Sequence, residues 1–199
     1  MNATETLRPP INEELRRATI DVLRERGWEG LTLERIAEVT GRARSTLWRQ
    51  GLTRDSLIAA LVGELAEDFR STMYPILTSG GTGRERLTRG LEALCDLLDR
   101  HLPLMLATDE AFHQKEAPDQ PPDYLHPFIQ FLREGAADGS LAVGENVVRA
   151  ADIAFNAVAW TFVHLRGRHE WELAEARDRV VGLVLNGIEG SGPRGKEKE

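Results

Sequence analysis

Four arginines and no acidic residue occupy the stretch from Gly41 to Arg54. Their planar side chains can each hold two acceptor atoms of a guanine edge or of a phosphate, which makes arginines on an exposed helix typical of DNA contacts. The whole chain has a net charge of −7, but charges near a phosphate matter most because salt screens interactions beyond about 10 Å. The number of arginines alone is equally consistent with a solvated arginine-rich surface. Their placement on the predicted helices must decide between that surface and a DNA-binding one.

Two short helices around Gly41 would position these arginines. Thr32 can cap a first helix that turns Ile36 inward, and Gly41 can take the left-handed conformation that a tight turn requires. A second helix then begins near Arg44 and turns Leu47 inward. This spacing is typical of a helix-turn-helix motif, whose second helix enters the major groove of DNA. The placement therefore favours DNA over a merely solvated surface.

The order of these residues resembles the amino-terminal domain of the TetR/AcrR (tetracycline-repressor) family of transcriptional regulators. The matching residues are Gly27–Trp28, Leu31–Thr32, Ile36–Ala37, Gly41, Thr46–Leu47–Trp48–Arg49 and Thr53–Arg54–Asp55–Ser56–Leu57. The resemblance covers residues 11–61, and beyond it only the all-helical layout fits. It implies an all-α protein with an N-terminal three-helix helix-turn-helix domain and a C-terminal helical domain for ligand binding and dimerisation.

Three positions depart from the pattern that the family usually shows. Arg42 stands where an apolar residue is usual, Gly51 where an aromatic one is usual, and Trp48 where a tyrosine is usual. Because the first two are normally core positions, they suggest a less stable domain or a tilted recognition helix. They also motivate a second hypothesis, a helical protein-interaction module that has kept the scaffold and lost operator binding.

The predicted DNA-binding residues carry hydroxyl, indole N–H or guanidinium donors. They are Thr32, Arg42, Arg44, Ser45, Thr46, Trp48, Arg49 and Arg54. We expect Arg44, Thr46 and Arg49 to read base edges, since arginine pairs with guanine through two parallel hydrogen bonds. We expect Thr32, Trp48 and Arg54 to hold phosphates, and we place Arg42 and Ser45 in the same surface without a more specific role.

Apolar residues at helical spacing predict helices along most of the chain and no strand. The expected helices span 11–26, about 31–40, about 44–50, 53–74, 84–102, 104–113, 123–137, 145–166 and 171–189. The predicted domains are a flexible arm over 1–10, a DNA-binding domain over 11–56, a helical effector-binding and dimerisation domain over 57–190, and a disordered tail over 191–199.

The last two helices carry more apolar surface than a single partner helix can cover. We therefore expect a homodimer in which each molecule contributes both helices to a four-helix bundle, as the resemblance also implies. The alternative is that both helices are buried within a monomer. A dimer is what a palindromic operator in double-stranded DNA requires, because two recognition helices must lie about one DNA turn apart or a multiple of it.

Nine residues of the second domain are candidates to line an effector site. They are Met73, Cys95, Met105, Phe112, Phe128, Phe131, Asn156, Trp160 and His164. Methionines and aromatic residues at helical spacing are more often simply core, but if the site exists its small-molecule effector should be largely apolar. Asn156 and His164 lie eight residues apart on a mostly apolar helix, where they would either orient a ligand or be satisfied by the protein itself.

Motifs for catalysis, metal binding and membrane insertion are missing from the sequence. The five histidines are scattered, Cys95 is the only cysteine, and no HExxH, CxxC, GxSxG or phosphate-binding loop occurs. We expect no enzyme, cofactor or metal, since a third hypothesis, an enzyme acting on a bound small molecule, lacks a catalytic constellation. No apolar run would cross a bilayer and no signal peptide begins the chain, so we expect a cytoplasmic, ligand-responsive transcriptional regulator, most simply a repressor.

Overall fold

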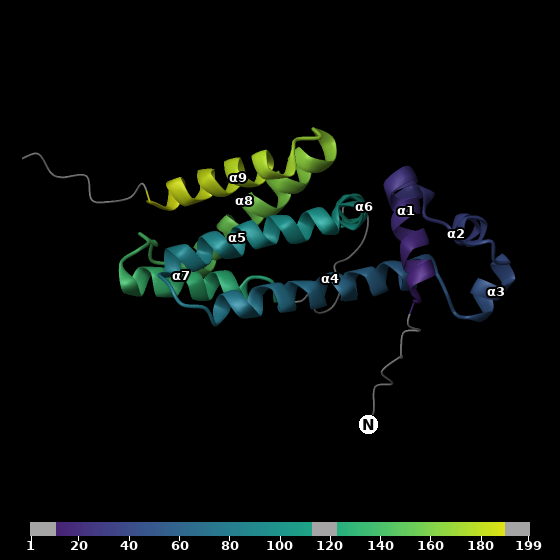
Figure 1. Cartoon of the computed structure of the whole chain (residues 1–199), viewed down its shortest axis with the longest axis horizontal. Helices are drawn as coiled ribbons and strands as arrows, with labels where there is room; N and C mark the ends of the chain where they lie inside the picture. Colours follow the sequence, from purple (N-terminus) through teal and green to yellow (C-terminus); the bar gives the residue numbers. More distant parts are fainter. Residues whose placement is uncertain (1–10, 113–122, 190–199) are drawn as a thin grey trace, which may run out of the picture. The chain divides into compact units, whose positions relative to one another are not determined.

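The computed structural model of the chain describes residues 11–112 and 123–189, and these residues form nine helices without any strand (Figure 1). In chain order the helices are α1 (Glu13–Gly30), α2 (Leu33–Thr40), α3 (Arg44–Arg49), α4 (Arg54–Leu77), α5 (Gly83–Arg100), α6 (Leu102–Phe112), α7 (His126–Asp138), α8 (Val147–Arg168) and α9 (Leu173–Glu189). The all-α fold predicted from the sequence is confirmed. The predicted arm at 1–10 and tail at 191–199 lie outside the described residues.

Glycine and proline mark the helix ends that the sequence analysis located, with small differences. Gly27 interrupts α1 with φ 63° and ψ −165°, and one further turn reaches Gly30. Pro103 lies in the first turn of α6 instead of before it, because the missing N–H of a proline has no helical partner there anyway. Pro75 lies inside the last turn of α4, where only the end of that helix is affected.

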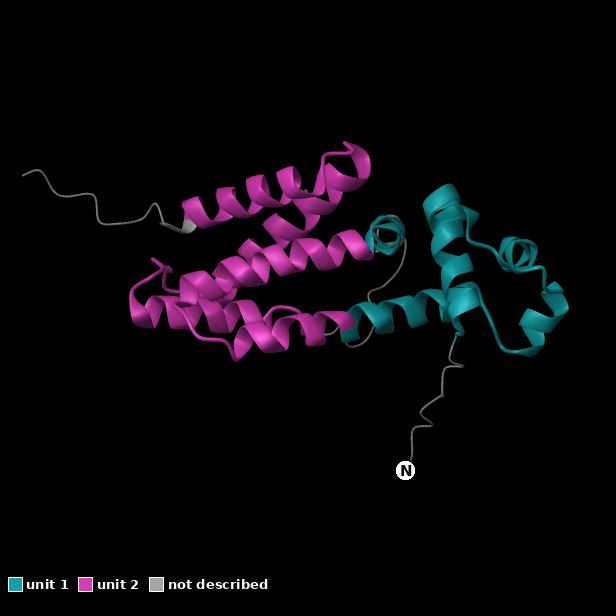
Figure 2. Ribbon diagram, viewed as in Figure 1, with its two compact units in different colours: residues 1–67, 101–119 teal, residues 68–100, 120–199 magenta. Residues whose placement is uncertain are grey.

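The chain divides into two compact units, coloured separately in Figure 2. Unit 1 comprises residues 1–67 and 101–119, and unit 2 comprises residues 68–100 and 120–199. The division therefore falls inside α4, and it groups α6 with the first three helices, whereas the sequence analysis placed residues 57–190 together. A boundary at residue 56 remains a prediction.

Unit 1 is built around α1, which lies against α2 and α6, while α2 lies against α3. Its core is a set of buried apolar side chains from five helices and their connections. They are Leu15, Val22, Leu23, Trp28, Leu31, Ile36, Leu47, Leu52, Leu57, Leu61 and Leu104. The short helices α2 and α3 depend on this packing, because isolated helices of their length are unstable in water.

Unit 2 is a bundle in which α5 lies against α7, α8 and α9, and α8 also lies against α7 and α9. The start of α5 approaches the end of α7 so closely that a Cβ atom on Gly83 would lie 2.0 Å from the backbone nitrogen of Gly135. At this crossing the carboxylate of Asp138 accepts a hydrogen bond of 2.7 Å from the N–H of Gly83. Hydrogen bonds to its carboxylate lower the pKa of Asp138. The largest contribution comes from the Ser140 hydroxyl, and smaller ones come from the N–H groups of Gly83 and Ser140.

Within the described ranges, none of the helices has both the length and the apolar character needed to span a bilayer.

Candidate nucleic-acid interface

The turn between α2 and α3 has the backbone geometry that the sequence predicts. The Thr32 hydroxyl accepts a hydrogen bond of 3.2 Å from the N–H of Arg35 and so caps α2. Gly41 ends α2 with φ 65°, and a Cβ atom there would meet no other atom. The requirement for glycine is therefore conformational, since other residues adopt this backbone only with strain.

Buried leucines and isoleucine fix which side of α3 faces outward. Ile36 on α2 and Leu47 on α3 are fully buried, with a relative exposure of 0% each. Leu52, just past the end of α3, is also buried. Because Leu47 is the only buried residue of this six-residue helix, the remaining side chains of α3 are left at or near the surface.

The outward side of α3 carries most of the predicted DNA-binding residues. Arg44, Ser45, Trp48 and Arg49 are exposed, and Thr46 is half-buried. Trp48 is 65% exposed, which is unusual for an indole and leaves its N–H open to an outside acceptor. Arg49 makes no ion pair with any residue that the structure describes. This side of α3 therefore presents cationic and hydrogen-bonding groups to the surroundings.

Two other predicted arginines have carboxylate partners inside unit 1. The Arg44 guanidinium pairs with Glu34 of α2, and both side chains are more than half exposed. The Arg42 guanidinium pairs with Glu14 of α1, and its side chain is 29% exposed. Exposed ion pairs of this kind contribute only about 0–1 kcal/mol to the stability of the fold. Arg44 can therefore exchange Glu34 for another acceptor at small cost. Arg42 instead connects the turn to α1.

Arg54 lies at the start of α4 and stacks on Trp28. The centre of its guanidinium is 3.7 Å from the Trp28 ring centroid. Its Nε and one Nη atom are buried without a hydrogen-bond partner, which leaves only the remaining nitrogen for an outside phosphate. The sequence analysis treated Arg54 as a phosphate ligand, and its contact with Trp28 was not anticipated.

Gly51, expected at a core position, lies in an exposed turn. Its φ of 73° is left-handed, and no atom lies within 4 Å of the position where a Cβ would be. The apolar side chain that closes the core at this point belongs to the next residue, Leu52, which is 3% exposed. The two departures that motivated a non-DNA-binding module thus have a local account, namely a glycine turn at Gly51 and the pair of Arg42 with Glu14.

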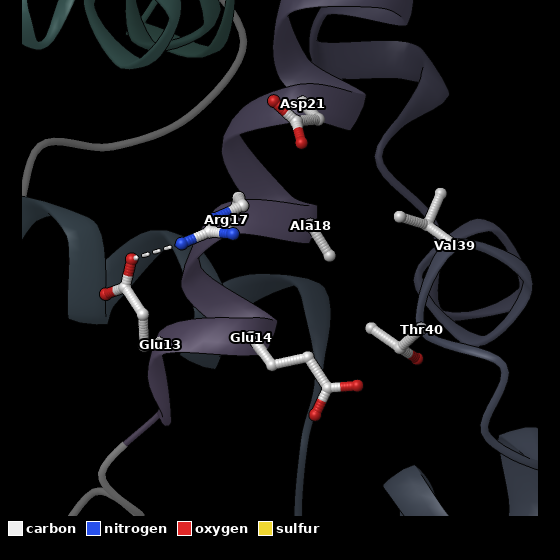
Figure 3. Close-up of a pocket in the computed structure, with 7 residues that line it drawn as sticks. All are labelled: Glu13, Glu14, Arg17, Ala18, Asp21, Val39 and Thr40. Carbon is white, nitrogen blue, oxygen red and sulfur yellow. Dashed lines mark ion pairs between the residues drawn. The ribbon is translucent and has the colours of Figure 1, made fainter.

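An open hollow of about 410 Å³ lies between α1 and the end of α2 (Figure 3). Its lining residues are Glu13, Glu14, Arg17, Ala18, Asp21, Val39 and Thr40. The Arg17 Nη2 atom lies 3.6 Å from the Glu13 Oε1 atom, so the one cationic side chain in the lining is already paired with a carboxylate. The other two carboxylates are paired as well, Glu14 with Arg42 and Asp21 with Arg24. The charges that line the hollow are therefore largely compensated, and it offers no evident site for phosphate.

The candidate effector residues fall into separate groups. Met73, Cys95, Phe128 and Phe131 are buried in unit 2. Asn156, Trp160 and His164 are exposed on α8, whereas Met105 is half-buried on α6 in unit 1. The side chain of Phe112 lies outside the described part of the structure. The nine candidates therefore do not converge on one site within the described residues.

The three exposed candidates on α8 belong to a row of side chains spaced four residues apart. The side-chain amide of Asn156 donates to the Asp152 carboxylate at 2.8 Å, and the Trp160 indole N–H donates to the Asn156 carbonyl oxygen at 3.2 Å. Asn156 and Trp160 are thus satisfied within α8 itself, whereas His164 meets His169, just past the end of the helix. Asn156 therefore follows the alternative that the sequence analysis left open, in which its polar group is satisfied by the protein.

An aromatic cluster in unit 2 includes residues that the sequence analysis did not select. The Phe128 ring lies 6.0 Å from Phe131 and 5.5 Å from Phe155, measured between centroids. Tyr124 lies 6.4 Å from Phe155 and 4.9 Å from Phe69, and burial raises the pKa of Tyr124. These rings come from four different segments, so helical spacing alone could not have grouped them.

The lone cysteine is buried in the same unit. Cys95 has a relative exposure of 0%, and burial raises the pKa of its thiol to about 12, assisted by the nearby carboxylate of Asp96. The thiolate is the reactive form of cysteine. The described surroundings therefore keep Cys95 unreactive near neutral pH.

Comparison with solved structures gives extensive matches, all at low sequence identity. A TetR-family transcriptional regulator, PfmR from Thermus thermophilus, matches with a TM-score of 0.70 and 15% identity, covering 89% of this chain and 100% of that one. The regulator FadR from Bacillus subtilis, solved in complex with stearoyl-CoA, matches with a TM-score of 0.69 and 19% identity over 88% and 98% of the two chains. A TetR/AcrR-family regulator from Thermobifida fusca matches with a TM-score of 0.65 and 20% identity, covering 87% of this chain and 96% of that one.

No family model matches the sequence, and no curated protein matches it either. The structural matches extend over nearly the whole of each chain, so they concern both units and not the helix-turn-helix alone. They show that this chain has the fold of the TetR/AcrR-family regulators. At this identity they do not show what it binds.

Proposed function

We propose that this chain, folded as the TetR/AcrR-family regulators are, is a ligand-responsive DNA-binding transcriptional regulator. The observation that carries the proposal is the outward side of α3, where Arg44, Trp48 and Arg49 are exposed over a core closed by Leu47. In this reading the protein is no enzyme and works in the cytoplasm, where the DNA is.

In the proposed complex, α3 enters the major groove of the operator. Arg44, Thr46 and Arg49 contact base edges, and Ser45 lies beside them on the exposed side. Phosphates are held by Trp48 and by the capped start of α2 at Thr32. Arg42 and Arg54 have partners inside unit 1, so we assign them mainly to the support of the motif.

The proposed regulator is a homodimer that binds a palindromic operator. Large apolar side chains are exposed on α8 and α9: Val148, Ile153, Trp160 and Leu183, of which Ile153 is 70% and Leu183 73% exposed. Apolar side chains of this size at such exposure mark protein interfaces when they cluster. Association through these two helices would bring two copies of α3 to a palindrome, with half-sites about 34 Å or a multiple apart.

The proposed effector is a small, largely apolar molecule that binds in unit 2 and releases the repressor from DNA. The candidate residues that are buried there, Met73, Cys95, Phe128 and Phe131, offer only apolar or weakly polar surface. One structural neighbour binds stearoyl-CoA, whose acyl chain has the same character. A ligand of this kind acts only through its different affinity for the DNA-bound and released conformations.

The proposal is tested with the duplex immediately upstream of the protein's own gene. Fluorescence anisotropy of the full chain should show binding that weakens about tenfold or more between about 50 and 200 mM salt, because phosphate contacts release counterions. Arg133→Ala, at an exposed position on α7 in unit 2, should bind like the unmodified chain. Absence of binding at the lowest salt would instead favour the protein-interaction module.

The effector is tested in the same assay with stearoyl-CoA and with free stearate as probes. Release of the DNA at micromolar concentrations of either one supports an apolar effector site. If neither releases the DNA and neither raises the melting temperature of the full chain, the assignment of a long apolar effector fails, while the DNA-binding part of the proposal is unaffected.

A further inference from the structure

Two histidines bring their ring nitrogens together at the C-terminal end of α8. The Nε2 atoms of His164 and His169 lie 3.0 Å apart. Their ring centroids are 4.7 Å apart, and the ring planes are inclined by 67°. Imidazoles meeting head-on at that nitrogen separation would have centroids about 5.3 Å apart. The rings are therefore inclined to the line that joins the two nitrogens, as they must be when two imidazoles share one ion.

We propose that His164 and His169 form a two-ligand site for a divalent late-transition-metal ion, with Cu²⁺ bound most tightly. Imidazole nitrogens bind such ions at about 2.0–2.1 Å, which puts two ligands about 2.8–3.4 Å apart for square-planar to tetrahedral angles. The separation of 3.0 Å between the two Nε2 atoms falls inside that range. Both side chains are exposed, so an ion and its waters can reach them.

The segment that carries His169 is held in place by contacts independent of the two rings. The N–H of Trp171 donates to the carbonyl oxygen of Leu165 at 3.1 Å. The Arg166 guanidinium donates to the Trp171 carbonyl oxygen and to the Asp99 carboxylate, the latter at 2.7 Å. These bonds fix the corner after α8 before any ion arrives. A preorganised pair loses less conformational freedom on binding than two mobile side chains would.

The charges around the pair do not oppose a cation. Arg166 is paired with Asp99, and Arg168 also has a partner of its own. Two exposed carboxylates, Glu170 and Glu172, follow His169 closely in the chain. The charge of Arg166 is thus compensated, and the added carboxylates favour positive charge in this corner.

The site supplies two protein ligands, because no group of three His, Cys, Asp or Glu side chains suited to a metal occurs in the described part of the chain. Water would complete the coordination, so the affinity should be moderate and should follow the usual order in which Cu²⁺ exceeds Ni²⁺ and Zn²⁺. The competing account is an imidazole–imidazole hydrogen bond with no role in ion binding. The proposal does not depend on DNA binding or on the effector.

The full chain is titrated with CuCl₂ at about pH 7.5, and binding is followed by competition with a chelating dye and by electron paramagnetic resonance. We expect a single bound ion per chain whose spectrum shows hyperfine coupling to two nitrogens. His164→Ala and His169→Ala should each lower the affinity about tenfold or more. His126→Ala, at an exposed histidine on α7, should leave it unchanged.

The helix content of all variants is first compared by far-ultraviolet circular dichroism. His169→Gln provides a second, milder replacement if His169→Ala loses helicity. If His164→Ala, His169→Ala and His169→Gln retain the affinity of the unmodified chain, the proposal is overturned. A coupling pattern of one nitrogen, or no ion bound at micromolar Cu²⁺, would overturn it equally.

Discussion

The outward sides of α3 and α8 expose very different groups. On α3, the exposed side chains include Arg44 and Arg49, next to a Trp48 that is 65% exposed. On α8, Ile153 is 70% exposed and Trp160 38%, and they lie beside a short row of hydrogen-bonded polar groups. A cationic helix side suits phosphate and base edges, whereas large apolar side chains exposed among polar ones suit another protein surface. The contrast assigns different kinds of partner to the two helices.

The two helices also differ in what lies beneath them. α3 is short, has no side-chain cap, and is anchored by Leu47. α8 buries Phe162 together with several small or medium side chains, among them Ala151, Ala154 and Ala159, so its neighbours can approach closely along much of its length. The position of a short helix with one buried residue depends on its surroundings, whereas α8 is held along its length by several buried residues.

The largest expected effect comes from charging the outward sides of α8 and α9. Ile153→Asp combined with Leu183→Asp should convert the proposed dimer into a monomer and weaken operator binding by about 10²–10⁴-fold, because the two half-sites are then bound independently. Light scattering after size exclusion gives the mass, and anisotropy gives the affinity. Tyr74→Asp, at a position 68% exposed on α4, is the matched control. A double variant that stays dimeric would contradict the assignment of these helices.

Removing the buried anchor of α3 should be nearly as damaging, but through stability. Leu47→Ala should lower the free energy of unfolding of unit 1 by about 2–5 kcal/mol, since it leaves a cavity under a fully buried side chain. Val39→Ala, at a position 52% exposed on α2, should change it by less than about 0.5 kcal/mol. Urea denaturation followed by circular dichroism measures both. Equal effects of the two substitutions would mean that α3 is not held as described.

The exposed arginines should affect DNA binding without affecting stability. Arg49→Ala should weaken operator binding by about 5–150-fold, the equivalent of about 1–3 kcal/mol for a paired base contact. Arg26→Ala, which removes another exposed arginine from the same unit, should change the affinity little. Anisotropy and thermal melting together separate the two effects. The account fails here if the two variants bind DNA alike.

The smallest expected effect concerns the carboxylate beside Arg44. Glu34→Gln removes the partner of Arg44 and should raise the affinity for DNA a few-fold, with the plot of log affinity against log salt steeper by about one. Glu38→Gln, on the same helix and paired with Arg35, is the control for the simple loss of a negative charge. Identical salt slopes for the two variants would show that Glu34 does not compete for Arg44.

Local patterns in the sequence predicted the helix-turn-helix well. Thr32, Ile36, Gly41 and Leu47 lie within sixteen residues, and their roles follow from helix spacing, capping and the conformational freedom of glycine. The contacts of the arginines were missed because their partners are distant in the chain. Glu14 lies 28 residues before Arg42, and no periodicity relates Trp28 to Arg54.

The effector candidates show the corresponding weakness in unit 2. Helical spacing placed Asn156 and His164 on one side of α8, and both are exposed, but spacing could not say whether that side faced inward. The aromatic cluster went unnoticed for a related reason, since Phe69, Tyr124 and Phe155 meet only through packing of separate segments. Both misses reflect tertiary packing, which pairs residues regardless of their distance in sequence.

The most direct test of the proposed role of α3 attaches a cleavage reagent to a cysteine introduced on that helix. Cys95 is buried with a raised thiol pKa, so an iron-chelate cleavage reagent will attach selectively to Ser45→Cys on the exposed side of α3. With the upstream duplex, the account predicts two clusters of cuts about 10 base pairs apart or a multiple of that distance. Cleavage no different from that given by the same reagent on Arg133→Cys of α7 would contradict it.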